Sequence, residues 1–205
     1  MSRSSGIFVC ALMALLAGCS QEPQTVEKKA PAKPAEPISG LSALYKMYQV
    51  ARSWAPDAEV LTMSSMRLAD VPVVPGKAGA WQAVFTSASR NLSRSYTYSV
   101  AEEENVHEGV FGGPQESWTG SRGENTSFLI AAVKKDTTAA YQTALSKAAA
   151  EYDKKNPGKT ISLLLEKTSQ FPDPVWRVIW GDSISTSNFS VFVDAMTGEY
   201  QQTMR

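Results

Sequence analysis

The sequence offers few side chains of the kinds that enzymes use for chemistry. His107 is the only histidine among the 205 residues, and a Ser-His-Asp triad requires a histidine as its base. His107 follows the acidic run Glu102 to Glu104, and the sequence contains no G-x-S-x-G stretch to position a nucleophilic serine. We therefore expect His107 to lie in a solvated loop. The sequence predicts no catalytic residue and a protein that is not an enzyme; a hydrolase is the less favoured alternative.

Metal ligands are equally scarce. Zinc sites combine three or four His, Cys or carboxylate ligands, and calcium loops space their oxygen ligands at alternating positions around a glycine. The three glutamates at 102 to 104 are adjacent instead, so we expect a solvated turn. Asp194 and Glu199 could form an acid–base pair, but Asp194 can instead bond the backbone of its own turn, and we expect Glu199 to face solvent. The sequence predicts no metal and no cofactor.

Tryptophan rings could stack on a ligand or a partner. Trp81 and Trp176 occupy matching positions in two similar stretches, so both are predicted to lie in the core between helix and sheet. Trp180 would share the strand face of Trp176. Trp118 lies in a polar connecting stretch, and it is the one residue that we predict as a partner contact.

The N-terminus has the pattern of a targeting segment. Arg3 precedes an apolar run from Ile7 to Ala17, which is too short to span a bilayer. The run ends in Leu-Ala-Gly-Cys19, which resembles the lipobox of bacterial lipoproteins. The resemblance implies a signal peptide over 1–18, lipid (palmitate) on Cys19, and a membrane-anchored protein of the cell envelope. An ordinary signal peptide is the alternative. Residue 20 is Ser, not the Asp that favours inner-membrane retention, which implies the outer membrane facing the periplasm if the source is Gram-negative.

The residues after Cys19 are predicted to form a tether. Gln21 to Ser39 is rich in Pro, Ala, Lys and Glu and cannot bury a core. Cys10 would leave with the signal peptide, so the mature chain would have no thiol for a disulfide or a nucleophile. Twenty basic and twenty acidic residues give zero net formal charge. Without a basic face, nucleic acid is not an expected partner.

The first part of the folded region predicts one helix and several strands. Leu41 to Trp54 has apolar residues at helical spacing and ends before Pro56. Strands are predicted over Glu59 to Leu68, Ala80 to Phe85 and Tyr96 to Val100. A polar linker is predicted over 87–95, and a short strand over Val106 to Phe111.

The second part has a similar order. Ala139 to Tyr152 predicts a helix, because it is rich in alanine and other good helix formers. Strands are predicted over Thr160 to Lys167, Val175 to Trp180 and Phe189 to Val193, followed by the turn Asp194 to Glu199. Gln115 to Thr126 is expected to be an ordered connection, and 128–133 fits either a strand or a helix.

Two residue patterns occur in both parts. Val175 to Trp180 matches Ala80 to Phe85, and Phe189 to Val193 matches Tyr96 to Val100. The Trp-containing strand and the Asp-Ala-Met-Thr-Gly-Glu turn from Asp194 resemble PepSY-like domains, over roughly 136–205 and more weakly over 41–111. The resemblance implies an α+β fold of two pseudo-repeated units, each with one helix packed on a small antiparallel sheet. The predicted segments are signal peptide 1–18, lipidated Cys19 and tether 19–38, first unit 39–111, connection 112–135 and second unit 136–205.

Members of that family are associated with restraint of peptidases or sensing of envelope components. The resemblance therefore implies a non-catalytic protein that binds an envelope protein or peptide, with restraint of a peptidase as its most concrete form. A structural or assembly accessory of the envelope is the alternative. Whether the two units share one sheet is left open by the sequence.

Overall fold

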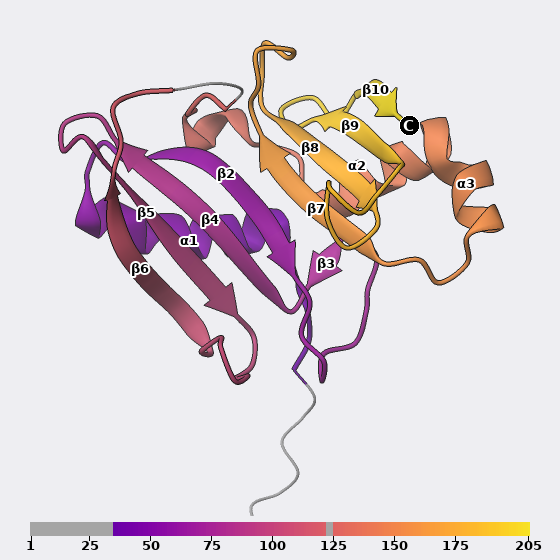
Figure 1. The fold of residues 1–205 in the computed structure, drawn as a ribbon, viewed down its shortest axis with the longest axis horizontal. Coiled ribbons are helices and arrows are strands. Elements are labelled where there is room, and N and C mark those ends of the chain that lie inside the picture. The colour runs from indigo at the N-terminus through magenta and orange to yellow at the C-terminus, as the bar shows by residue number, and fades with distance from the viewer. Residues whose placement is uncertain (1–34, 122–124) are drawn as a thin grey trace, which may run out of the picture. The chain divides into compact units, whose positions relative to one another are not determined.

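One antiparallel sheet of eight strands organises residues 35–121 and 125–205, which are the residues described by the computed structural model (Figure 1). The strand order is β10-β9-β8-β7-β2-β4-β5-β6. The first half of the sheet consists of β2 (Glu59–Met66), β4 (Ala80–Ser87), β5 (Leu92–Ser99) and β6 (Gly109–Ser117). The second half consists of β7 (Ile161–Glu166), β8 (Val175–Trp180), β9 (Ser190–Asp194) and β10 (Tyr200–Met204). The predicted α+β class is confirmed, and the two halves share one sheet.

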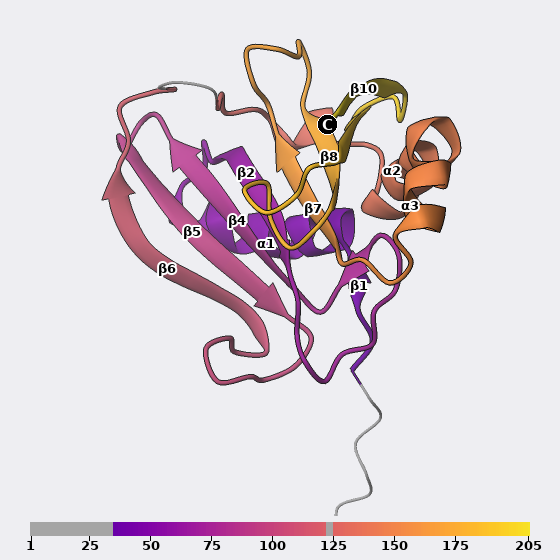
Figure 2. The same ribbon diagram turned by 45° about the vertical axis from the view of Figure 1, so that its right-hand side comes forward.

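The helices lie on one face of this sheet (Figure 2). Helix α1 (Gly40–Trp54) packs against β4 and β5, and α2 (Thr137–Ala144) packs against β8 and β9. One large hydrophobic core runs under both helices. Two shorter strands, β1 (Ile38–Ser39) and β3 (Lys77–Ala78), pair with each other beside the sheet.

The alanine-rich sequence predicted one continuous helix from Ala139 to Tyr152, but the structure divides it into three segments. After α2 the chain makes a π turn, η2 (Leu145–Ala149), and resumes as α3 (Ala150–Lys155). The buried residues Ala144 and Ala149 are five apart, which is the repeat of a π turn. Helix propensity alone does not predict such an interruption.

Three other expectations differ from the structure. The predicted polar linker over 87–95 is much shorter, because β4 runs to Ser87 and β5 begins at Leu92. Strand β6 extends past Phe111, the predicted end of the strand, through Gly112-Gly113-Pro114 to Ser117, because proline is tolerated on an edge strand. The C-terminal strand β10 was not predicted. Within 128–133, Phe128 bridges to Val60 and a 3-10 turn, η1 (Ile130–Ala132), follows.

Candidate functional site: a groove between the two halves of the sheet

The two halves meet at a pair of buried tryptophans. Trp81 and Trp176 are both fully buried, as predicted, and their rings meet edge to face with centroids 6.5 Å apart. The indole Nε1 of Trp81 donates to the carbonyl of Ile38 at 3.2 Å, and that of Trp176 donates to the carbonyl of Lys135 at 2.8 Å. Each carbonyl immediately precedes the N-cap residue of a helix. The two tryptophans therefore fix the starts of the two helices in the same way.

The helix N-termini also contact each other directly. One carboxylate oxygen of Asp136 accepts from the backbone N–H of Thr137 at 2.7 Å and from that of Leu41 at 3.0 Å. It thus caps its own helix α2 and also helix α1, whose N-cap residue Ser39 makes no side-chain cap bond. The Thr137 hydroxyl accepts from the N–H of Gly40 and donates to the carbonyl of Gly76. This polar cluster holds the halves in a fixed relationship at the helix side of the sheet.

Strands β2 and β7 form the seam between the halves, and their pairing is short. The register joins Thr62 to Glu166, Met63 to Leu165 and Ser64 to Leu164. At the next position the Ser65 hydroxyl accepts from the N–H of Leu163 at 2.9 Å, in place of a backbone carbonyl. Beyond this point the two strands diverge, and a space opens between the end of β2 and the beginning of β7.

A groove of about 410 Å³ occupies that space, and we call it the seam groove. Its walls come from the end of β2, the loop from β2 to β3, β3 itself, the start of β7 and Asp182. Leu68 and Val71 form an apolar wall, which is the surface of a small second core that includes Ala80. Ser162 fixes the opposite wall, because its hydroxyl donates to the carbonyls of Gly181 and Asp182.

Charged side chains at this groove are mainly basic. Arg67, Lys77 and Lys159 line it together with one acid, Asp182. Arg67, Lys77 and Asp182 are exposed, whereas Lys159 is half-buried and donates to the Tyr152 hydroxyl at 2.9 Å. An apolar wall flanked by cations can bind an anionic ligand that also carries apolar groups. Sequence reasoning missed this site, because its cations come from three separate segments and no local pattern joins them.

The predicted contact residue Trp118 lies elsewhere. It is half-buried beside a hollow of about 260 Å³ that it shares with Leu61 and Asn125. Its backbone N–H donates to the carbonyl of Asn91 at 3.0 Å. The position therefore leaves part of the indole accessible, but the seam groove does not include it.

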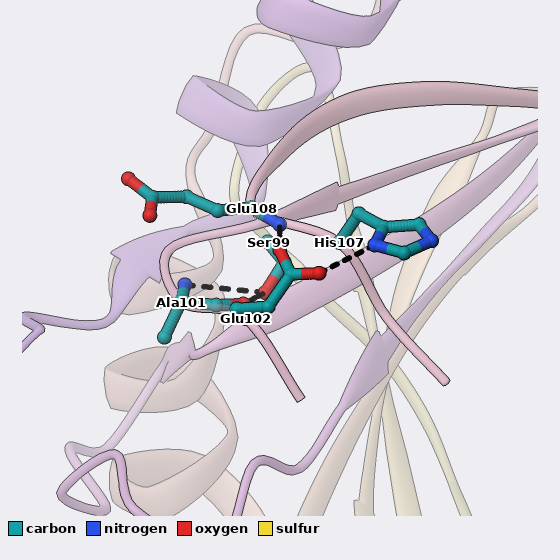
Figure 3. A network of polar contacts seen from close by, with 5 residues as sticks. All are labelled: Ser99, Ala101, Glu102, His107 and Glu108. Carbon is teal, nitrogen blue, oxygen red and sulfur yellow. Dashed lines mark hydrogen bonds and ion pairs between the residues drawn. The ribbon is translucent and has the colours of Figure 1, made fainter. Parts of the chain in front are cut away.

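His107 lies in the exposed turn between β5 and β6 (Figure 3). Its Nδ1 is 2.5 Å from a carboxylate oxygen of Glu102, whose other oxygen accepts from the N–H of Glu108 at 2.8 Å. These two contacts, the backbone bond first, lower the pKa of Glu102. In the same view the Ser99 hydroxyl donates to the carbonyl of Ala101. Both side chains of this pair are exposed, so the histidine has the solvated position that the sequence predicted.

Asp194 also has the predicted local role. Its carboxylate accepts from the N–H of Met196 at 2.8 Å and of Thr197 at 2.7 Å, within the turn that Gly198 closes with φ of 82°. Glu199 is exposed. Asp194 therefore bonds its own turn and Glu199 faces solvent, as the sequence predicted.

An ion pair is buried on the sheet face opposite the helices. Arg177 lies 3.9 Å from Glu166, donates to the Ser190 hydroxyl at 3.0 Å and covers the Phe192 ring. Burial lowers the pKa of Arg177, and the carboxylate of Glu166 opposes this shift. A carboxylate, a hydroxyl and an aromatic face therefore surround the guanidinium within the second half of the sheet.

Several predictions concern other parts of the chain. Cys19 and the signal peptide lie outside the residues that the structure describes. Within the described ranges, no cluster of three His, Cys, Asp or Glu residues could hold a metal ion. Over the same part of the chain, none of the helices has the length and apolar content required to cross a membrane.

Comparison with known proteins gives one structural similarity. No protein-family model matches the sequence, and no curated protein matches it. Among solved structures, the chain is similar to the crystal structure of a candidate lipoprotein from Clostridium difficile 630, with 10% sequence identity and a TM-score of 0.46. The similarity covers 78% of this chain and 91% of that one.

Proposed function

We propose that this chain is a lipid-anchored, non-catalytic protein of the bacterial cell envelope that binds a protein or peptide partner through the seam groove. The observation that carries the proposal is the groove itself, in which an apolar wall and three cations lie at the point where β2 and β7 diverge. The lipobox-like sequence ending at Cys19 and the tether that follows support the location. A tether raises the local concentration of a binding module near the membrane.

Two PepSY-like units are part of this proposal. In the described residues, each half is a helix followed by four strands in a meander, and the two tryptophans make equivalent bonds. The most concrete form of the function is restraint of an envelope peptidase. The alternative is a structural or assembly accessory of the envelope, in which the same groove would bind a structural partner.

Site-specific photocrosslinking of the full chain in its own cells tests the proposal. Val73 lines the groove and is 73% exposed, so a photoreactive amino acid placed there should join the chain to a bound protein. The control is the same amino acid at Leu129, which is 62% exposed and does not line the groove. A protein adduct at 73 and none at 129 supports binding at the groove, whereas equal adducts or none at 73 would contradict it.

The identity of the adduct then separates the two forms. A peptidase whose activity falls when the purified chain is added supports restraint, and an assembly or cell-wall protein supports the accessory role. Metabolic labelling with palmitate tests the anchor separately. The label should enter the wild-type chain and be absent from Cys19→Ser; labelling of that variant would overturn the anchor assignment.

A further inference from the structure

The opposite end of the β2–β7 seam shows how this fold fills a gap between the two strands. There the chain segment before η1 lies between them in an extended conformation. Phe128 exchanges both backbone hydrogen bonds with Val60 on the β2 side, each at 2.9 Å. Thr126 donates to the carbonyl of Lys167, just past β7, at 2.8 Å. A short extended segment therefore completes the sheet at that end.

At the groove end, the start of β7 is available for the same kind of pairing. The ladder with β2 ends at Ser64 and Leu164, and Leu163 directs its N–H toward Ser65. Alternate residues of a strand direct their backbone groups to the same neighbour, so the N–H and C=O of Ile161 point toward β2 as well. Ile161 lines the groove, and it lies beyond the last pair of the ladder.

The side chains around this backbone specify the charge of an occupant. Arg67 and Lys77 come from the β2 side of the groove, and Lys159 comes from the β7 side. Only Asp182 offsets them among the lining residues. Carboxylates bound by Arg and Lys form charge-assisted hydrogen bonds, which are stronger than those between neutral groups. The apolar wall of Leu68 and Val71 can cover the alternate side chains of an extended chain.

We propose that the groove binds an extended, acidic segment of the partner protein, which pairs with β7 at Ile161 and places carboxylates among Arg67, Lys77 and Lys159. This inference rests on the proposed function and names the chemistry of the partner. The occupant would take the place that residues 125–128 take at the other end of the seam, except that it would come from another chain.

Peptide binding to the full-length chain in detergent micelles tests the inference by fluorescence anisotropy. The probe is a labelled octapeptide of alternating Val and Thr that ends in Asp-Glu with a free carboxylate. The comparison peptides end in Asn-Gln amide or carry N-methyl groups on alternate residues. We expect the acidic peptide to bind and each comparison peptide to bind about tenfold more weakly, because charge-assisted or backbone hydrogen bonds are lost.

Matched protein variants locate the binding. Arg67→Gln with Lys77→Gln should weaken the acidic peptide about tenfold, whereas Lys147→Gln with Lys154→Gln, which removes equal charge from exposed positions outside the groove, should leave it within about twofold. Equal binding by both variants, equal binding of the acidic and amide peptides, or groove-dependent binding of phosphatidylglycerol vesicles without peptide binding would each overturn the inference. If the protein adduct at position 73 persists in any of these cases, the proposed function stands and only the acidic segment is wrong.

Discussion

Trp81 and Trp176 meet edge to face at 69°, although they belong to different halves of the sheet. Each ring also donates to the carbonyl that precedes a helix N-cap. One contact thus joins two strands, two helix starts and the two halves. Both rings are fully buried, so we expect this contact to couple the stability of the two halves.

Replacing either ring should destabilise the whole fold. Trp81→Leu and Trp176→Leu should each lower the free energy of unfolding by about 2–4 kcal/mol, because each leaves a cavity and an unpaired carbonyl. The double variant should show a coupling of about 0.5–1.5 kcal/mol between the rings. Urea unfolding followed by circular dichroism measures these values. The matched control, Trp118→Leu, should cost less, since that ring is only half-buried; additive losses at 81 and 176 would exclude the coupling.

Asp136 should stabilise two helices at once. Asp136→Ala removes the acceptor for the N–H groups of Thr137 and Leu41, and a single cap typically contributes about 0.5–2 kcal/mol. We expect a loss at the upper end of that range in thermal unfolding. Asp136→Asn keeps an acceptor oxygen and should recover most of it. Asp70→Ala, at an exposed carboxylate, serves as the control, and a loss at 136 no greater than at 70 would exclude the double cap.

Gly40→Ala should reverse the usual effect of this substitution in a helix. Alanine normally favours a helix over glycine by about 1 kcal/mol. At position 40, however, an added Cβ would lie 2.6 Å from a methyl carbon of Thr137 and 2.9 Å from the Trp176 ring. Such overpacking costs about 1–3 kcal/mol, so we expect a net loss of stability in urea. Gln49→Ala, on the exposed side of the same helix, should be neutral or stabilising. A more stable Gly40→Ala would show that the helix starts are not closely packed.

Asp57 should contribute to stability in a pH-dependent way. The N–H of Ser89 and the hydroxyl of Ser87 donate to its carboxylate and lower its pKa from 3.8 to about 2. Because the pKa is lower in the folded state, the contribution is present above pH 3.8 and is lost as the pH falls toward 2. Unfolding measured between pH 2 and pH 6 should show this loss in the wild type and a smaller one in Asp57→Asn. An NMR titration that places the carboxyl pKa near 3.8 would contradict the prediction.

Local patterns in the sequence were sufficient for most elements and for the buried tryptophans. Helical spacing located α1, and the matching strands placed Trp81 and Trp176 in the core. The extension of β6 through Pro114 was not predictable, because tolerance of proline depends on a strand lying at the edge. The groove was not predictable either. Arg67 and Lys159 come together only because β2 and β7 pair and then diverge, and no nearby residues encode that divergence.

The seam between β2 and β7 also sets an order of events during synthesis. Gly40 and Thr137, whose contact joins the helix starts, are 97 residues apart in the chain. Strand β7 begins at Ile161, 95 residues after β2 ends at Met66, so at about 5–20 residues per second it is synthesised about 5 to 20 seconds later. During that interval the outer edge of β2 lacks its partner strand, and the Trp81 ring lacks its contact with Trp176. Because an unpaired strand edge can pair with another chain, this interval is when the first half is most open to aggregation.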